Sequence, residues 1–195
     1  MHGAGSGPWV FDSWAPPEGV AVTAVDLQDG IDVASASMDD YARALVAACG
    51  PLPRPLALCG WSMGGLVAMM AARDVEPDVL VLIEPSAPVE TQGAAAAGDA
   101  TGTFDPEIVY GRFPDRIPSR PESERARADR KRGISIPALP RRSLVVFGDE
   151  FEHERGRALA DHYGIDSAHF PGLSHWDLVL SPAVHRRIFS YVTGG

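Results

Sequence analysis

Short runs of apolar residues recur along the chain, and more polar segments with helical spacing separate most of them. Residues 20–26, 55–59, 79–83 and 143–148 have the length and apolar character of strands, and residues 168–170 form a shorter run. The run at 79–83 contains no polar residue, which is typical of a parallel strand that is buried on both faces. This pattern predicts an α/β fold with a mostly parallel sheet that helices cover on both faces.

The segments between these runs predict helices. Ser37 can cap a helix over residues 38–49, because a hydroxyl at this position accepts a hydrogen bond from the first turn. Residues 66–72, directly after the second apolar run, are rich in helix formers. The remaining helices are expected from about residue 152 to 163 and from about residue 177 to 192.

The regular alternation stops between residues 86 and 140. Prolines and glycines are spread through this stretch, residues 93–98 are low in complexity, and residues 125–132 form a basic run. We interpret the stretch as an irregular, partly helical insertion that covers a site as a cap. For the basic run, a solvated helix face is the simpler interpretation, and attraction of an acidic substrate or carrier is the functional alternative.

Length and charge narrow the classes of function. A chain of 195 residues with 45% apolar content suits one domain with a sizeable core, and its net charge of −9 argues against nucleic acid or an anionic membrane as the main partner. No apolar run approaches the roughly 20 residues of a membrane span, and the N-terminus lacks signal-peptide features, so we expect a cytoplasmic protein. No metal-binding or phosphate-binding motif is present, so no cofactor is expected.

The sequence G-W-S-M-G-G at residues 60–65 carries the strongest chemical signal. It lies between the apolar run at 55–59 and the helix at 66–72, which is the strand-turn-helix context of a nucleophile elbow. In such a turn Ser62 takes a strained backbone conformation that exposes its hydroxyl. The backbone amide of Met63, at the helix N-terminus, then points toward a developing oxyanion.

Two further motifs complete a pattern. H-G-A-G-S-G lies at residues 2–7, and G-L-S-H-W-D lies at residues 172–177. Together with the elbow, in this order, they resemble the α/β-hydrolase fold family of serine esterases, lipases and thioesterases. The resemblance implies that Ser62 is a nucleophile, that His175 is its general base, and that the amides of Ala4 and Met63 form the oxyanion hole. It also implies a small-molecule ester or thioester as substrate.

The acidic member of the triad departs from the family pattern. The family places an aspartate three residues beyond the glycine that ends the strand here at Gly148, and this position is Phe151. Asp149 is close enough to substitute if the loop bends. Glu84 is the rival, because it follows the preceding strand, where some family members carry their acid. Glu150 and Glu152 are further alternatives.

A second departure concerns the start of the chain. In the family, a buried strand precedes the His-Gly loop, whereas here only Met1 precedes His2. We therefore expect either that residues 20–26 pair directly with the elbow strand or that an apolar segment is missing from this chain. Two other functions stay open: a same-fold lyase or carbon–carbon hydrolase that uses His175 as a base, and a non-catalytic ligand-binding member of the fold.

Overall fold

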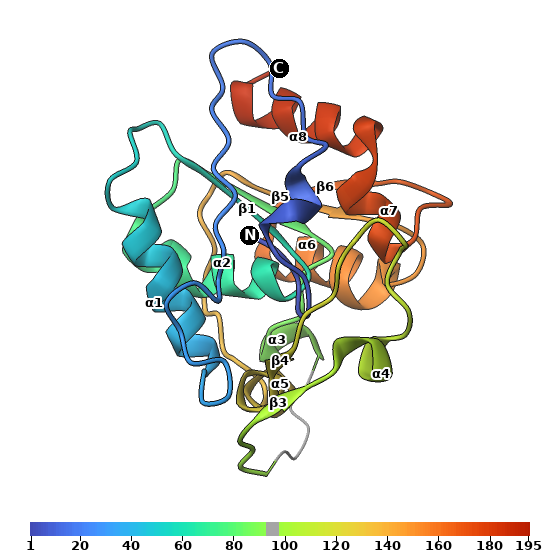
Figure 1. The fold of residues 1–195 in the computed structure, drawn as a ribbon. Helices are drawn as coiled ribbons and strands as arrows, with labels where there is room; N and C mark the ends of the chain where they lie inside the picture. The colour runs from blue at the N-terminus through green and yellow to red at the C-terminus, as the bar shows by residue number, and fades with distance from the viewer. Residues whose placement is uncertain (93–97) are drawn as a thin grey trace.

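The structure, a computed structural model, describes residues 1–92 and 98–195. At its centre lies a four-stranded parallel sheet with the order β1-β2-β5-β6 (Figure 1). The parallel sheet predicted from the apolar runs is therefore confirmed, with strand boundaries close to the expected ones. The strands are β1 (Ala57–Trp61), β2 (Val79–Ile83), β5 (Ser143–Phe147) and β6 (Asp166–His169).

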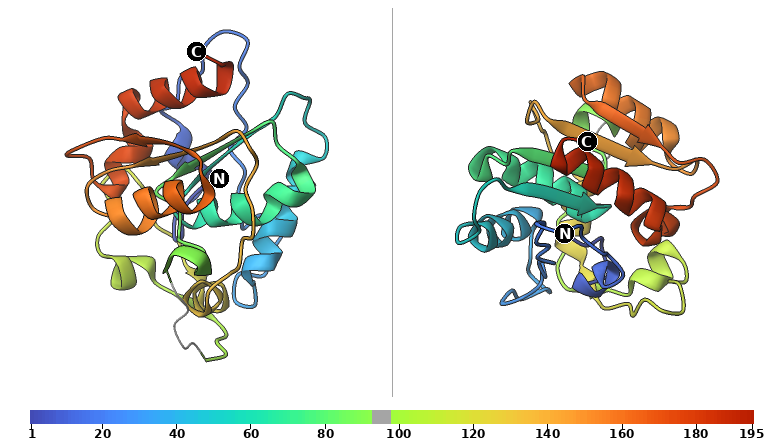
Figure 2. Two further views of the ribbon diagram at one scale, coloured as in Figure 1. Left: turned by 180° about the vertical axis from the view of Figure 1, so that it is seen from behind. Right: turned by 90° about the horizontal axis from the view of Figure 1, so that it is seen from above.

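Helices cover both faces of this sheet, as the sequence predicts (Figures 1 and 2). Alternate residues of each strand point to opposite faces. Leu80 and Leu82 of β2 therefore join the core on the side of α1, α2 and α6, while Val81 of the same strand joins the core on the side of α7 and α8. The helices are α1 (Met38–Cys49), α2 (Met63–Val75), α6 (Ala158–Tyr163), α7 (His175–Leu180) and α8 (Pro182–Thr193).

Local signals explain where several of these helices begin. Ser37 caps α1 as predicted, and it forms a capping box in which Asp40 also bonds back to the Ser37 backbone. A short 3₁₀ helix, Pro8–Phe11, begins with proline and packs on the α7 side of the sheet. The helix expected from residue 152 is present, but its first part, Glu152–Arg157, is a π-helical turn that leads into α6.

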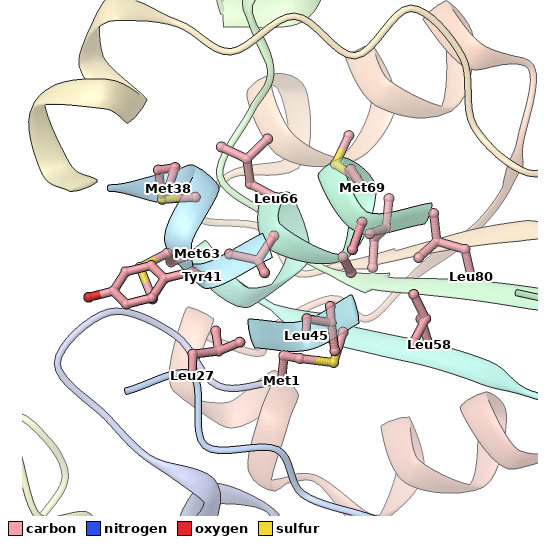
Figure 3. Close-up of a cluster of buried hydrophobic side chains, with 14 of the residues drawn as sticks. Met1, Leu27, Met38, Tyr41, Leu45, Leu58, Met63, Leu66, Met69 and Leu80 are labelled. Carbon is pink, nitrogen blue, oxygen red and sulfur yellow. The ribbon is translucent and has the colours of Figure 1, made fainter. Parts of the chain in front are cut away.

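The core between the sheet and helices α1 and α2 includes the very start of the chain (Figure 3). Met1 and Leu27 pack there beside Leu45 and Leu58, so the loop after Met1 is anchored in the hydrophobic core. The Met1 amino group donates a hydrogen bond to the Cys59 carbonyl at 2.6 Å. The Trp61 amide donates to the Met1 carbonyl at 3.0 Å, so Met1 runs alongside β1.

The strand predicted at residues 20–26 is wrong. This segment has neither helical nor strand structure, and it does not pair with β1. Its side chains are largely solvent-exposed, and Val22 is 45% exposed. The β-branched residues favour extended backbone, but a strand also needs a free neighbouring edge, and Met1 occupies the edge of β1 next to Cys59 and Trp61.

The stretch between residues 86 and 140 has little regular structure in its described part, and its role as a cap stays a prediction. A two-stranded antiparallel ribbon of β3 and β4 joins its two halves. The elements of this stretch are α3 (Val89–Gln92), β3 (Thr103–Phe104), α4 (Pro106–Tyr110), β4 (Glu122–Ser123) and α5 (Glu124–Arg132).

Among the described helices of the protein, none combines the length and the hydrophobicity needed to cross a membrane.

Candidate active site

Ser62 forms a tight turn between β1 and α2. Its backbone has φ 55° and ψ −123°, a strained conformation for a residue with a side chain. Glycines make the turn possible: a Cβ on Gly60 would lie 2.3 Å from the Gly64 carbonyl oxygen, and one on Gly64 would lie 2.4 Å from the His2 carbonyl oxygen. The Ser62 amide donates to the Ile83 carbonyl at 3.0 Å, which ties the turn to the next strand.

Glu84 lies directly after β2, beside the elbow. Its side chain is completely buried, and its φ of 39° turns the chain away from the sheet. One carboxylate oxygen accepts a hydrogen bond from the Gly148 amide at 2.8 Å. The other lies 2.6 Å from Nδ1 of His175, so both oxygens are engaged.

His175 is the first residue of α7 and is held from three sides. Its amide donates to Glu150 at 3.1 Å, and its carbonyl accepts from the Trp61 indole at 3.1 Å. Because Nδ1 faces the Glu84 carboxylate, the tautomer that fits this contact carries its hydrogen on Nδ1, and its Nε2 keeps a lone pair. Among the described residues, neither Nε2 nor the Ser62 hydroxyl has a hydrogen-bond partner, so both can respond to a substrate.

The other acidic candidates do not reach the His175 ring. Asp149 is exposed, and its two oxygens contact the His169 ring at 2.8 Å and the Gly172 amide at 2.7 Å. The Gly172 amide and His169 hold the pKa of Asp149 below its usual value. Phe151 stands at the family's usual acid position. It packs edge-on against the His175 ring, with 5.5 Å between the ring centres. Glu150 meets only the His175 backbone, and Glu152 pairs with Arg157.

One group of side chains has the composition of a metal site. Ligand atoms of Asp149, Glu152 and His169 lie within 4.8 Å of one another. However, Asp149 already bonds to His169 and to the Gly172 amide, and Glu152 already pairs with Arg157. These contacts explain why the three side chains lie together: they stabilise the turn after β5.

The glycine-rich loop at residues 2–7 packs directly against the elbow. A Cβ on Gly3 would lie 2.7 Å from the Trp61 ring and 3.0 Å from the Ser62 Cβ atom, so only glycine fits there. The amides of Ala4 and Met63 make no hydrogen bond within the described part of the chain. Met63 directly follows Ser62 in the chain, and Ala4 follows Gly3, which packs against Ser62, so both amides are candidate oxyanion donors.

Residues from the irregular stretch hold this loop in place. The Gly5 amide donates to the Glu122 carboxylate at 3.1 Å, and the Gly5 carbonyl accepts from the Arg120 amide at 2.9 Å. The Arg120 guanidinium donates to the Ser6 carbonyl at 2.8 Å. Glu122 is completely buried and also accepts hydrogen bonds from the Tyr41 hydroxyl and the Ser123 amide. Burial and the Glu122 charge raise the pKa of Tyr41.

A second set of contacts holds the start of the loop. The buried His2 ring has Nδ1 2.9 Å from the Gly3 carbonyl, and its Nε2 accepts from the Leu27 amide at 3.0 Å. Asp26 forms an ion pair with Arg120 at 2.5 Å. The His2 ring, 3.4 Å from Asp26, and the Arg120 guanidinium hold the pKa of the Asp26 carboxyl well below its usual range.

The sequence motifs did not point to Glu122, Arg120 or Asp26 as parts of this site. Arg120 and Glu122 lie in a stretch without periodicity, and Asp26 was assigned to a strand that does not form. Aromatic rings line the same region: Trp176 lies 4.7 Å from Trp61 and 4.5 Å from Phe113 between ring centres. These rings form an apolar wall beside His175.

Known proteins resemble this chain in fold. No curated protein matches the chain. The methylesterase MES16 from Arabidopsis is 21% identical, with a TM-score of 0.63 over 100% of this chain and 95% of that chain. A thermophilic esterase is 16% identical, with a TM-score of 0.68 over 99% and 88% of the two chains. A pyrethroid hydrolase from Sphingobium faniae JZ-2 is 15% identical, with a TM-score of 0.61 over 99% and 94%. At these identities the likeness concerns the fold. Residues 1–192 match the alpha/beta hydrolase family, so the chain belongs to that family.

Proposed function

We propose that this protein is a cofactor-free serine hydrolase that cleaves a small carboxylic ester or thioester through an acyl-enzyme on Ser62. One observation carries the proposal: the buried Glu84 carboxylate lies 2.6 Å from Nδ1 of His175, beside the strained serine turn. A buried carboxylate, an oriented imidazole and an elbow serine are the three groups that nucleophilic acyl transfer requires.

In this proposal His175 Nε2 accepts the Ser62 proton as the serine oxygen attacks the substrate carbonyl. Glu84 keeps the ring in the tautomer with hydrogen on Nδ1 and stabilises the imidazolium that forms. The amides of Ala4 and Met63 donate to the oxyanion, and the N-terminus of the 13-residue helix α2 adds its favourable dipole. His175 then protonates the leaving group, and a water molecule releases the acyl group by the reverse sequence.

Glu84 rather than Asp149 is the proposed acid. The geometry supports this choice, because Asp149 is committed to His169 and Gly172 while Glu84 is committed to His175. The Gly148 amide also donates to the second oxygen and fixes the orientation of the Glu84 carboxylate. The acid follows β2 and the histidine begins α7, beyond β6, so the two groups meet at the carboxyl-end edge of the sheet.

Covalent labelling tests the proposal. A fluorophosphonate probe should react with the protein, and mass spectrometry should locate the adduct on Ser62. Ser62→Ala should abolish labelling and lower the hydrolysis of a 4-nitrophenyl ester by about 10³-fold or more, while the thermal unfolding transition is retained. An adduct on another residue, or unchanged turnover in Ser62→Ala, would contradict the proposal. Turnover that needs His175 but not Ser62 would instead favour base-catalysed lyase chemistry.

A further inference from the structure

Arg155 lies near the candidate triad, with one aromatic ring between them. It belongs to the π-helical turn Glu152–Arg157 and is half-buried. Its guanidinium carbon lies 3.9 Å from the centre of the Phe151 ring. The Phe151 ring in turn contacts the His175 ring edge-on at 5.5 Å. A cation stacked on an aromatic face in this way keeps its five N–H donors free at the rim of its plane.

No acceptor for these donors is present in the part of the chain that the structure describes. Two of the nearby carboxylates are engaged, because Glu84 binds His175 and Gly148 and Glu150 binds the His175 amide. The third, the exposed Glu154, forms no hydrogen bond or ion pair with Arg155. Burial lowers the pKa of Arg155, and the carboxylates of Glu84, Glu154 and Glu150 oppose this shift, so the guanidinium stays charged. A half-buried charge without a hydrogen-bond partner is unfavourable, and a bound anion would supply the missing acceptor.

The cap side of the same region presents a second cation. Arg130 of α5 donates to the Tyr110 hydroxyl at 3.1 Å, and Tyr110 is among the groups that influence the pKa of Arg155. Within the basic run, Arg127 and Arg132 are neutralised by Glu124 and Asp129. Arg130 has no ion pair among the described residues. Arg125 and Lys131 of the same run also have no ion pair among the described residues, so the functional interpretation of the basic run applies to these three side chains.

We propose that Arg155 binds a carboxylate of the substrate, so that the preferred esters carry a negative charge away from the scissile bond. This inference rests on the proposed hydrolase function and names its substrate class. The planar guanidinium suits a carboxylate, which can accept two parallel hydrogen bonds from its free edge. The acidic neighbours Glu150 and Glu154 favour a singly charged group over a doubly charged phosphate.

Matched ester pairs test the proposal, because each pair differs mainly in charge. The first pair places the charge on the acyl side: the 4-nitrophenyl monoester of glutarate against 4-nitrophenyl valerate. The second places it on the alcohol side: 4-carboxyphenyl acetate against phenyl acetate. In Arg155→Gln, the ratio of kcat/KM for the anionic ester to kcat/KM for the neutral ester should fall by roughly tenfold or more in one of the pairs.

The chain offers a matched control for this variant. Arg157 belongs to the same turn, is 55% exposed and already pairs with Glu152. Arg157→Gln should leave both ratios within about twofold of the wild-type values, as expected for an exposed ion pair. Arg155→Lys should restore part of the preference, because it keeps the charge but loses the two-pronged contact.

The outcomes distinguish a failure of the proposed role of Arg155 from a failure of the proposed hydrolase function. Unchanged ratios in both pairs, or equal losses for the charged and neutral esters, would overturn the role of Arg155 and leave it as structural support for Phe151. Failure of the fluorophosphonate to label Ser62 would overturn the hydrolase itself, and the inference with it. Glutarate should also slow labelling of the wild-type protein more than labelling of Arg155→Gln, and equal protection would contradict the proposal.

Discussion

The two sides of the candidate active site are built in different ways. Ser62 follows β1, Glu84 follows β2, and His175 is the first residue of α7. The ends of these strands and of this helix bring the three side chains together. Ala4, in contrast, lies on a loop without regular structure. This loop is held by hydrogen bonds with Arg120 and Glu122, more than a hundred residues away in the chain.

The difference shows which parts of the site depend on the sheet and which depend on the irregular stretch. Adjacent strands in a parallel sheet share one register, so the side chains at their carboxyl ends meet as a consequence of the fold. A loop has no such ladder and takes its position from side chains that reach it. We therefore expect substitutions at the sheet side to lower ester turnover alone. Substitutions at the loop side should lower both ester turnover and the free energy of unfolding.

The largest effect is expected at the sheet side, for Glu84→Gln. The amide can still accept from Gly148, but its neutral head no longer stabilises a charged His175 ring and can favour the wrong tautomer. Ester turnover should fall by roughly 10³- to 10⁴-fold, the scale known for such replacements in serine hydrolases. Steady-state kinetics across pH, with a thermal melt of each variant, measures both properties.

Asp149→Asn is the matched control for this change. Asp149 is an exposed turn residue that bonds to His169 and Gly172, so its replacement should change turnover by less than about threefold. Similar large losses in both variants would show that the choice of acid is wrong. Small losses in both would show that neither carboxylate serves His175.

A large but different effect is expected at the loop side, for Glu122→Ala. The variant leaves the Gly5 amide, the Ser123 amide and the Tyr41 hydroxyl without their buried acceptor. Each unpaired donor costs about 1 kcal/mol or more, so the free energy of unfolding should fall by roughly 3 kcal/mol. Urea denaturation measures this change.

Activity of Glu122→Ala should fall as well, because the Gly5 contact orients the loop that carries the Ala4 amide. We expect kcat to decrease by roughly tenfold or more at a temperature where the variant is folded, which is less than the loss of a complete oxyanion donor. A destabilised variant with unchanged kcat would break the comparison. It would mean that the loop keeps its position without Glu122.

The fold was largely predictable from the sequence. The uninterrupted apolar run at residues 79–83 became β2, and Ser37 became the cap of α1. Residues 20–26 show the limit of this reasoning: they have strand-forming composition but pair with no strand in the described part of the chain, because Met1 lies along the adjacent edge of β1. Composition reports a preference for extended backbone, whereas pairing depends on which segment reaches the edge.

The site was predictable only where the chain carries a local motif. The glycines around Ser62 predict the turn. The choice between Glu84 and Asp149, in contrast, depends on side-chain contacts that the spacing of residues in the sequence does not indicate. Both residues follow neighbouring strands, and they differ in whether their oxygens meet His175 or the turn at Gly172. No sequence motif indicates Glu122, because its role is to accept hydrogen bonds from donors that are distant in the chain, such as the Gly5 amide.

A smaller, pH-dependent effect is expected from Asp26 on the loop side. Its pKa in the folded protein lies below that of an unfolded chain, so the unfolded chain binds more protons as the pH falls. The stability that Asp26 contributes is therefore present above about pH 4 and is lost at lower pH. Between about pH 5 and 3 the wild type should lose more unfolding free energy than Asp26→Asn, as urea denaturation at several pH values can measure. Parallel curves would contradict a role for the Asp26 charge in holding Arg120 and the loop.

The smallest effect is expected for Ser37→Ala, which separates stability from chemistry. Ser37 caps α1, the helix that carries Tyr41, but makes no contact with Ser62, Glu84 or His175 among the hydrogen bonds of the described residues. Loss of the cap should lower the free energy of unfolding by about 1 kcal/mol. Turnover at 25 °C should stay within about twofold of wild type, because the fold retains most of its stability. If this variant lost activity as Glu122→Ala is expected to, instability alone would explain both results, and the specific role of Glu122 in placing the loop would be refuted.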